Sequence, residues 1–455
     1  MYSTIKIKNP SPTQTSVEST EIESLHSTLI EMTALYIPCI ITPSGEPWED
    51  GINFITDLTK PEYRAITNYE TLKGIADDLV TFMNVMHTNN MSYKTDHRLK
   101  PLRPTYFFSQ YIADSKYATS TGNRKINRVV TFYRWLMSSR NVTFKYTLWI
   151  EKKTVVRYEQ KIGLARYKEI ISTDLNIKSK GEPASANSVI DDGKLFPLDD
   201  DDQFKLLQSL KTLNNYVMIL IFVASLITGA RIQSVCTLRK KHFEKKNISD
   251  DEIINVRSGP GTGIDTKYSK AGVLEFPGWL YNMIKTYISS ADYANRVTKL
   301  ASQYSAADNY VFISTHGNPF YAANDDTHYK NSQWSPKGNS IRTFIHCQLT
   351  PILNLNGFNR SFHFHDIRAT TGLNLLLDNL ALVELGIISM DNLLKMVQEK
   401  LGHSKLDTTL QYLSLAKKTS DKKLIQTAWE NKMLPNRNTL IHDTLNTHEP
   451  KLKHI

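Results

Sequence analysis

The sequence predicts a mainly α-helical protein with a small antiparallel β-sheet, an α+β fold of more than one domain. Apolar residues recur at helical spacing in several long segments. Between Ile253 and Phe276 the pattern changes to short strand-like runs separated by turn residues. The chain has 455 residues, more than one ordinary core accommodates, and its 40% apolar residues are enough to build more than one core.

Residues 61–178 are predicted to form a small all-helical domain. One amphipathic helix carries the apolar residues Leu72, Ile75, Leu79, Phe82, Met83 and Met86. A second carries Ile126, Val129, Val130, Tyr133 and Leu136. Arg124 and Arg128 lie opposite this second stripe, where a basic face can meet a phosphate backbone; a solvated face is the equally ordinary alternative.

The remaining boundaries follow from composition. Residues 1–60 are rich in Ser, Thr, Pro and Glu with weak periodicity, and are interpreted as an N-terminal extension of unassigned role. Residues 179–194 are polar with Gly, Pro and Ser, which favours a linker. A second domain is predicted for residues 195–420, and a C-terminal tail for 421–455.

Charge and cysteine content limit the partners and the compartment. The net charge of +10 favours a polyanion as partner, although an ordinary basic protein fits it equally. The three cysteines, Cys39, Cys236 and Cys347, are odd in number and far apart, which argues against a disulfide framework and for a reducing compartment. The N-terminus lacks a signal pattern, and the longest apolar run, 217–227, is too short to span a bilayer. We therefore expect a soluble, cytoplasmic protein without a membrane partner.

Two polar clusters in the second domain could bind or protonate an anion. Arg231 follows Gly229 at the opening of a helix, where a guanidinium can donate two hydrogen bonds to a phosphate. Lys267 lies near a hairpin turn, from which a lysine can reach a ligand and donate a proton. Lys270 is the alternative; we prefer Lys267 because it precedes the turn and the following strand. Each residue alone is more often a solvated surface group.

A third cluster lies at residues 363–370. If a helix begins here, His365 and Arg368 share one face at its N-terminus. The simpler interpretation is a helix start capped by Asp366. Metal binding by His363, His365 and Asp366 is a further alternative, but no other ligands follow at a suitable spacing. We therefore predict neither a metal site nor a cofactor.

The fourth cluster lies at residues 401–412. A helix is predicted to end at Gly402, with His403 directly after it. Ser404 or Asp407 can cap the next helix, which carries Tyr412. Taken alone, Tyr412 is more often a half-buried core residue than a nucleophile.

Taken in order, the four clusters resemble the signature of the tyrosine recombinase (phage integrase) family: Arg, Lys, His-x-x-Arg, His, Tyr. The similar stretches are TGARI, HDIRAT and LGHSKLDTTLQY, and Tyr412 lies nine positions after His403, as in the family. The resemblance covers about residues 195–420, and implies a tyrosine recombinase-type catalytic domain. Residues 61–178 resemble the family's core-DNA-binding domain less specifically. Two positions depart: Ser234 replaces a common carboxylate, so another group must hold Arg231, and Ala369 replaces a common histidine.

The resemblance implies a role for each matched residue. Arg231 and Arg368 would bind the non-bridging oxygens of the scissile phosphate, and His403 would donate a hydrogen bond to it. Such a site neutralises the charge of the transferring phosphoryl group without a metal.

Three further residues would move protons or form the covalent bond. Tyr412 would be the nucleophile of a 3′-phosphotyrosine intermediate, assisted by His365. Lys267 would protonate the leaving 5′ oxygen. A phenol with an ordinary pKa of about 10 needs such help at neutral pH.

The implied function is site-specific DNA recombination, with integration or excision of a mobile element. The implied partners are double-stranded DNA with specific recombination sites, a homo-tetramer on that DNA, and accessory DNA-bending proteins; the implied location is nucleoid-associated. Arg124 and Arg128 would contact DNA, and residues 421–455 would pack on a neighbouring protomer. Two alternatives remain: a type IB topoisomerase-like enzyme that relaxes DNA as a monomer, and a catalytically silent DNA-binding protein.

Overall fold

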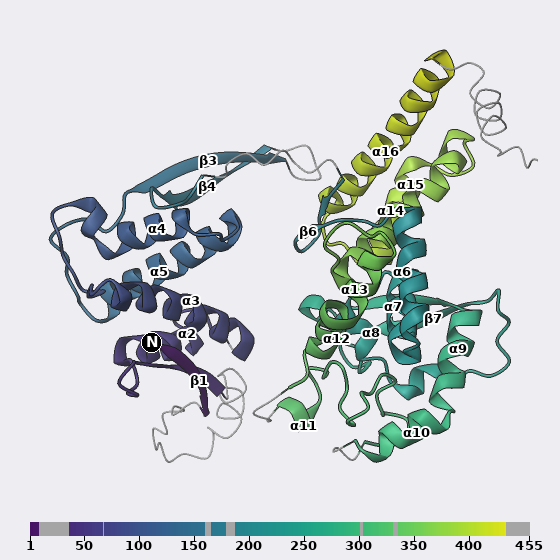
Figure 1. The fold of residues 1–455 in the computed structure, drawn as a ribbon, viewed down its shortest axis with the longest axis horizontal. Coiled ribbons are helices and arrows are strands. Elements are labelled where there is room, and N and C mark those ends of the chain that lie inside the picture. The colour runs from purple at the N-terminus through teal and green to yellow at the C-terminus, as the bar shows by residue number, and fades with distance from the viewer. Residues whose placement is uncertain are drawn as a thin grey trace, which may run out of the picture. The chain divides into compact units, whose positions relative to one another are not determined.

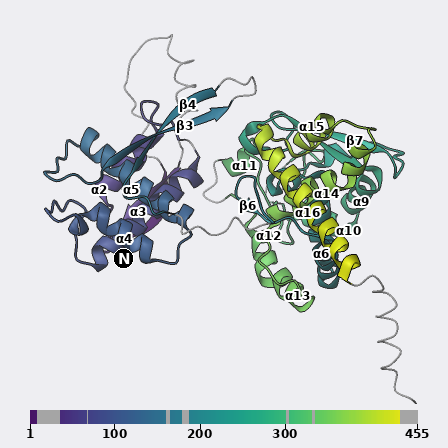
Figure 2. The same cartoon turned by 90° about the horizontal axis from the view of Figure 1, so that it is seen from above.

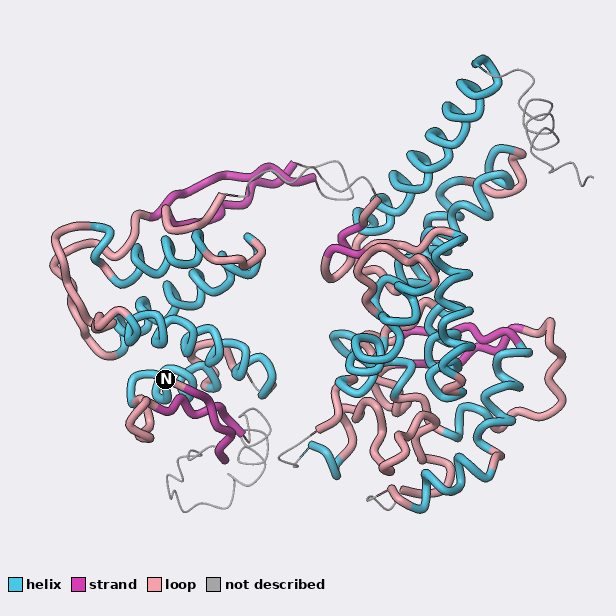
Figure 3. The backbone as a smooth tube through the Cα atoms, viewed as in Figure 1, coloured by secondary structure: helices cyan, strands magenta, loops and turns pink. Residues whose placement is uncertain are grey.

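The chain divides into two compact units, Met1–Glu182 and Pro183–Ile455. The computed structural model describes residues 1–8, 36–66, 68–159, 165–178, 187–300, 304–330 and 335–433. Helices dominate both units, and the strands form two-stranded antiparallel hairpins (Figure 1 and Figure 3). The predicted fold class is therefore confirmed. The boundary between the units lies inside the predicted linker 179–194.

Within its described residues, the first unit is built around four α-helices and an aromatic core. The helices are α2 (Glu49–Thr59), α3 (Tyr69–Thr88), α4 (Pro104–Asp114) and α5 (Thr119–Ser139), with a 3-10 turn η1 (Lys100–Leu102) before α4. Both predicted amphipathic stripes are buried, on α3 and α5. Phe132 of α5 contacts the rings of Trp48 and Phe54, so the centre of the unit is packed mainly by aromatic side chains.

An N-terminal hairpin completes this unit. Strand β1 (Ser3–Lys8) pairs antiparallel with β2 (Tyr36–Ile41), and both contact α3. Ile37, Ile40 and Phe54 belong to the same buried cluster as the helices. Residues 36–59 therefore contribute to the core, although the sequence predicts them to be part of an extension. Strand β2 is short, but Phe54, Ile55 and Leu58 of α2 do recur at helical spacing, so the sequence contained a signal for α2 that its interpretation missed.

A second hairpin lies within the region predicted to be all helical. Strand β3 (Glu151–Glu159) pairs antiparallel with β4 (Ala165–Thr173). The two segments contain the β-branched residues Val155, Val156, Ile170 and Ile171, which favour strands over helices. The all-helical prediction for 61–178 is thus wrong at this hairpin.

The second unit contains the helices and strands that carry the four clusters. Its α-helices are α6 (Asp200–Leu213), α7 (Tyr216–Thr228), α8 (Ile232–Cys236), α9 (Gly278–Ile288), α10 (Ala291–Thr298), α11 (Thr327–Lys330), α12 (Asn339–Phe344), α13 (Thr350–Leu355), α14 (Phe364–Glu384), α15 (Met390–Leu401) and α16 (Leu406–Met433). Shorter helical turns are η2 (Lys240–Phe243), η3 (Lys267–Ser269) and the π-helical η4 (Ile345–Leu349). The hairpins are β5 (Val189–Ile190) with β6 (Lys194–Leu195), and β7 (Ile253–Ser258) with β8 (Gly272–Pro277). The second of these is the pair of short strands that the sequence predicts between Ile253 and Phe276.

Helix α14 organises the second unit, because it packs against α7, α15 and α16 (Figure 1 and Figure 2). Helix α7 is apolar along most of its length, and it ends at Gly229, whose φ of +68° is the left-handed conformation that glycine tolerates. Among the described residues, none of the helices has the length and apolarity needed to cross a membrane. The packing of α14 brings the ends of α7 and α15 close to the start of α14 itself.

Candidate active site

The second unit brings the matched residues together from separate segments of the chain. Arg231 occupies the N-cap position of α8, Lys267 lies in the turn between β7 and β8, and His403 follows α15. His365 and Arg368 lie in the first turns of α14, and Tyr412 lies on α16. Between these groups lies a pair of carboxylates that the sequence did not single out, Asp191 and Asp192, in the turn between β5 and β6.

One oxygen of Asp191 is the meeting point of three of these side chains. Its Oδ2 lies 3.2 Å from Nε of Arg368, 3.0 Å from Nε2 of His403 and 3.2 Å from the hydroxyl of Tyr412. Asp191 is buried. Burial raises the pKa of Asp191, but the hydrogen bond from His403 and the charges of Arg368 and Arg231 outweigh it and hold the pKa well below its usual range. Asp191 is therefore ionised.

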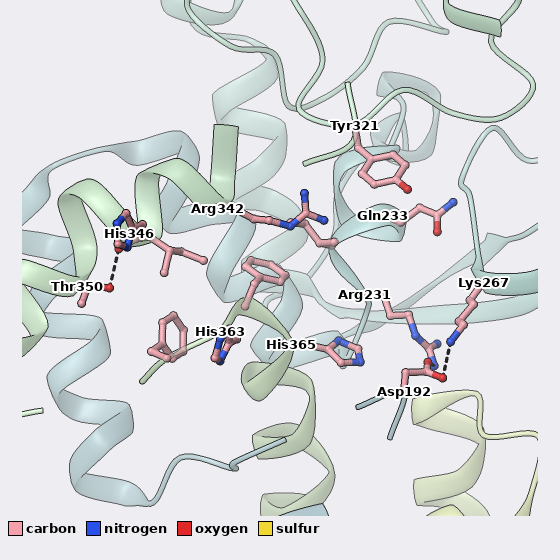
Figure 4. A pocket seen from close by; sticks show the side chains of 14 residues that line it. Asp192, Arg231, Gln233, Lys267, Tyr321, Arg342, His346, Thr350, His363 and His365 are labelled. Atoms are coloured by element: carbon pink, nitrogen blue, oxygen red, sulfur yellow. Dashed lines mark hydrogen bonds and ion pairs between the residues drawn. The ribbon is translucent and has the colours of Figure 1, made fainter. Parts of the chain in front are cut away.

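Asp192 engages the other two cations. Nη2 of Arg231 lies 2.8 Å from Oδ2 of Asp192, and Nζ of Lys267 forms an ion pair with its Oδ1 (Figure 4). Nη2 of Arg231 also lies 3.8 Å from Oδ1 of Asp191. Adjacent carboxylates thus collect Arg231, Lys267, Arg368 and His403 into one cluster.

Arg368 is held by the backbone as well as by Asp191. Its Nη1 donates to the carbonyl of Gly229 at 2.7 Å, and its Nη2 donates to the carbonyl of Leu401. These carbonyls are the ends of α7 and α15, and a β-carbon at Gly229 would lie 2.9 Å from the side chain of Leu401. The guanidinium is therefore positioned by two helix C-termini, independently of the carboxylate.

Arg231 lacks the carboxylate that the family often places three residues later. Ser234 instead donates to the backbone carbonyl of Asp265 at 2.7 Å. In this structure Arg231 donates to the carboxylate of Asp192 instead. Nε of Arg231 is buried and has no hydrogen-bond partner within the described part of the chain. The guanidinium thus keeps an unused donor inside the site.

His403 is oriented by its second ring nitrogen. Nδ1 lies 3.0 Å from Oγ1 of Thr409, and Nε2 faces Asp191. Gly402, with a φ of +59°, ends α15 and turns the chain so that His403 points back into the site. The predicted helix end at Gly402 is confirmed, and the imidazole lies against the ring of Tyr412 with centroids 5.6 Å apart.

Tyr412 is fully buried, with 0% of its surface exposed. Gly372 of α14 makes room for it, because a β-carbon there would lie 2.9 Å from Cε1 of the tyrosine ring. Burial and then the charge of Asp191 raise the pKa of Tyr412 well above its usual value, while Arg368 and Arg231 oppose the rise. In this arrangement the phenol is neutral.

His365 lies beside Arg231 and Asp192 in a cavity of about 610 Å³ (Figure 4). Burial, followed by the charge of Arg368, lowers the pKa of His365 to about 4. The imidazole is therefore neutral at pH 7 and can accept a proton. A second cavity of about 590 Å³ shares Asp192, Arg231 and Lys267 with the first, so Asp192 lies where the two cavities meet, and Asp191 lines the second cavity.

The capping interpretation of Asp366 is confirmed. Its carboxylate accepts hydrogen bonds from the backbone N–H of His363 at 2.8 Å and of Phe196 at 2.9 Å. Across the described residues, no group of three or more His, Cys, Asp or Glu side chains could hold a metal ion. Asp366 thus caps the N-terminus of α14.

The alternative lysine, Lys270, and the two arginines predicted to contact DNA lie in different surroundings. Lys270 donates to the carbonyl of Gly402 at 3.1 Å and is exposed, whereas Lys267 contacts the acidic pair. In the first unit, Arg124 is exposed and forms an ion pair with Asp78 at 3.0 Å. Arg128 is half-buried, and burial with the charge of Arg64 lowers its pKa. DNA contact by Arg124 and Arg128 stays a prediction.

Asp191 and Asp192 are the functional candidates that the sequence interpretation missed. The triplet Asp191-Asp192-Gly193 is a recognisable hairpin signal. Asp192 and Gly193 indeed adopt positive φ angles of 60° and 149°. This signal could have predicted the turn, but not that the turn would lie among the cations.

No protein-family model and no curated protein matches the sequence. The structure is similar to solved structures of integrases. One is the Tn1549 transposon integrase in complex with circular intermediate DNA, with 13% identity, a TM-score of 0.42, and 80% of this chain and 94% of that chain covered. Another is a lambda integrase dimer bound to a COC′ core site, with 12% identity, a TM-score of 0.43, and 80% and 94% covered.

Proposed function

We propose that this chain is a tyrosine recombinase that cuts and rejoins DNA through a phosphotyrosine bond at Tyr412. The observation that carries the proposal is the common contact of Tyr412, Arg368 and His403 with one oxygen of Asp191. A carboxylate oxygen stands here where an oxygen of a phosphodiester would be bound. The nucleophile and the groups that neutralise phosphate would then meet at one point.

The reaction follows from these positions. The oxygen of Tyr412 attacks phosphorus, a new P–O bond forms, and the bond from phosphorus to the 5′ oxygen breaks. The phosphate stays on the 3′ end of the cut strand as a tyrosine ester. Attack by a 5′ hydroxyl reverses the step, so rejoining needs no ATP. Exchange follows when that hydroxyl belongs to another strand.

Proton transfer is assigned to two side chains. His365, which is unprotonated at pH 7, is assigned as the acceptor of the proton of Tyr412. Lys267 donates a proton to the leaving 5′ oxygen, since its ammonium lies within reach of the group that Arg231 also contacts. The two guanidiniums neutralise the non-bridging oxygens.

The partners belong to the same proposal. The net charge of +10 suits double-stranded DNA, which a recombinase binds at specific sites. Recombination of two duplexes requires four such sites, and hence a homo-tetramer on DNA, with accessory DNA-bending proteins. The biological setting would be integration or excision of a mobile element in the nucleoid of the cytoplasm.

The test is a covalent adduct. A pool of nicked duplexes of random sequence is incubated with the full chain and denatured, and protein-linked DNA is recovered and mapped. We expect linkage at Tyr412 and none in Tyr412→Phe. The matched control is Tyr287→Phe, because the Tyr287 hydroxyl is buried without a hydrogen-bond partner within the described residues, so its removal leaves contacts unchanged.

The same recovered sequences separate the alternatives. Two duplexes that carry them should form a four-way junction if the chain recombines DNA. Relaxation of supercoiled DNA with an adduct but without a junction indicates the topoisomerase-like alternative. An adduct that persists in Tyr412→Phe contradicts the proposed nucleophile, and DNA binding with no adduct at all indicates a silent DNA-binding protein.

A further inference from the structure

The turn that carries Asp191 and Asp192 is a small, separate structure. We call residues 189–195 the acidic hairpin. Its strands pair only Val189 with Leu195 and Ile190 with Lys194, and the N–H of Asp191 donates to the carbonyl of Gly193 at 3.0 Å. Two residue pairs form a marginal ladder, so the hairpin depends on what it docks against.

The acidic hairpin docks on the helices that surround Tyr412. Val189 and Leu195 are buried in the cluster formed by α14, α15 and α16. The backbone N–H of Ile190 donates to the side chain of Gln411, the residue before Tyr412, at 2.8 Å, while the side chain of Ile190 is exposed. Apart from the contacts of its two carboxylates, the attachment is therefore small and includes one exposed side-chain hydrogen bond, which is typical of a segment with low local stability.

The two carboxylates take the donors that the proposed reaction needs. Asp191 accepts from Arg368, His403 and Tyr412, and Asp192 accepts from Arg231 and Lys267. A phosphodiester would need the same guanidiniums, imidazole and ammonium. Its negatively charged oxygens cannot share them with two carboxylates at contact distance, since like charges in a buried site repel strongly.

We propose that the acidic hairpin is an internal phosphate mimic, which occupies the site of the scissile phosphate in the free protein and leaves when DNA binds. This inference rests on the proposed function and adds its regulation. Arg368 and His403 stay in place when the hairpin leaves, because Arg368 is also held by the carbonyls of Gly229 and Leu401, and His403 by Thr409. The site is thus preorganised for an anion.

A permanent positioning role for Asp191 fits the contacts less well. The charge of Asp191 raises the pKa of Tyr412, so the docked carboxylate disfavours the ionised nucleophile. A residue that both repels the substrate and weakens the nucleophile acts against the reaction while it is docked. The hairpin belongs to the second unit, which begins at Pro183.

The first test measures anion binding to the full chain. Inorganic phosphate is titrated into wild type and into the double variant Asp191→Asn/Asp192→Asn by calorimetry. We expect at least tenfold tighter phosphate binding in the variant, because the site loses its internal competitor. The matched control, Asp200→Asn/Asp201→Asn, removes the same charge from the first turn of α6 and should bind phosphate as wild type does. Equal or weaker binding by the hairpin variant overturns the inference.

The second test uses the wild-type protein, so it does not depend on whether the hairpin variant folds. Hydrogen exchange of peptides that contain residues 188–195 is followed with saturating phosphate and with chloride of equal ionic strength. We expect this segment to exchange faster in phosphate than in chloride, because phosphate displaces the hairpin from the site. Protection that is unchanged at saturating phosphate overturns the inference.

These tests fail independently of the proposed function. If the chain forms no adduct at Tyr412 but the hairpin variant gains phosphate affinity, the phosphate mimic is supported and the recombinase function is contradicted. If the chain forms the adduct but the hairpin variant gains no phosphate affinity, the recombinase function is supported and the phosphate mimic is contradicted.

Discussion

Each unit of the molecule buries a carboxylate among cationic side chains, and the two clusters are built in different ways. In the first unit, Oδ1 of Asp78 on α3 lies 3.0 Å from both Arg124 and Lys125 of α5. Lys125 is buried and also donates to Thr81 at 3.0 Å. All of these residues lie on two packed helices, so the cluster is fixed whenever the helices are.

In the second unit the carboxylates come from a short hairpin, and the cations come from several separate segments. Arg368 keeps two backbone acceptors besides Asp191, and Arg231 keeps an unused Nε. The difference teaches that burial and short distances do not by themselves identify a structural ion pair. What matters is what else holds each cation: within the described residues, Arg368 has two backbone carbonyls besides Asp191, whereas Lys125 has one hydroxyl, that of Thr81, besides Asp78.

Arg368→Ala should have the largest effect. Asp191 would stay buried without its closest guanidinium, and breaking such a pair costs about 3–5 kcal/mol of the free energy of unfolding. Loss of one preorganised donor should also lower the rate of adduct formation about 100- to 1,000-fold. Denaturant unfolding and the adduct assay measure the two effects. By contrast Arg231→Ala, at a side chain 23% exposed, should lower cleavage but reduce stability by only about 1 kcal/mol.

A double variant separates these effects. Arg368→Ala with Asp191→Asn removes the uncompensated charge, so stability should recover in part while adduct formation stays low. No recovery of stability would mean that Asp191 is not the source of the loss.

Lys125→Met should have an intermediate effect, confined to the first unit. Asp78 would keep only the exposed Arg124, and loss of a charged hydrogen bond to a buried carboxylate costs about 2 kcal/mol. Arg124→Ala, which removes a side chain 56% exposed, should cost under about 1 kcal/mol. Denaturant unfolding measures both, and calorimetry should find the phosphate affinity of the second unit unchanged. A changed phosphate affinity would contradict the separation of the two clusters.

The ordered resemblance to the tyrosine recombinase signature, and not local spacing alone, pointed to the cationic residues that the structure brings together, and it did not point to the acidic pair. The ends of α7 and α15 at Gly229 and Gly402 and the capped start of α14 follow from glycine and capping chemistry. These features place Arg231, Arg368 and His403. The pair Asp191-Asp192 predicts a turn, but its docking against α16 depends on tertiary packing, which no local pattern encodes. The room that Gly372 leaves for Tyr412 is of the same kind.

The fold divides along the same line. Helices with long apolar stripes, such as α3 and α5, were predictable because one face must be buried over many residues. The hairpins β1–β2 and β3–β4 were not, because short strands pair with partners 20 or more residues away or lack a repeating stripe. The linker composition of 179–194 predicted a connection, while residues 189–194 fold against the second unit.

The smallest effect concerns two half-buried histidines, His365 and His242, which form no salt bridge with a carboxylate among the described residues. Burial is the first cause that lowers the pKa of both His365 and His242 to about 4, against an ordinary value of about 6.5. Above pH 6.5 both are neutral in the folded and unfolded chain. Between pH 6.5 and 4 only the unfolded chain takes up these protons, so the free energy of unfolding falls as pH falls.

Replacing either histidine should reduce the decrease in the free energy of unfolding between pH 6.5 and pH 4. For His365→Gln the difference from wild type should change by about 1 kcal/mol between pH 7 and pH 5.5, measured by denaturant unfolding. His242→Gln should flatten the stability profile similarly, but it should leave the pH profile of adduct formation unchanged, because His242 faces the carbonyl of Thr262 instead of the site. If His365→Gln and wild type lose stability in parallel down to pH 4, His365 is not the neutral buried base that the proposed reaction requires.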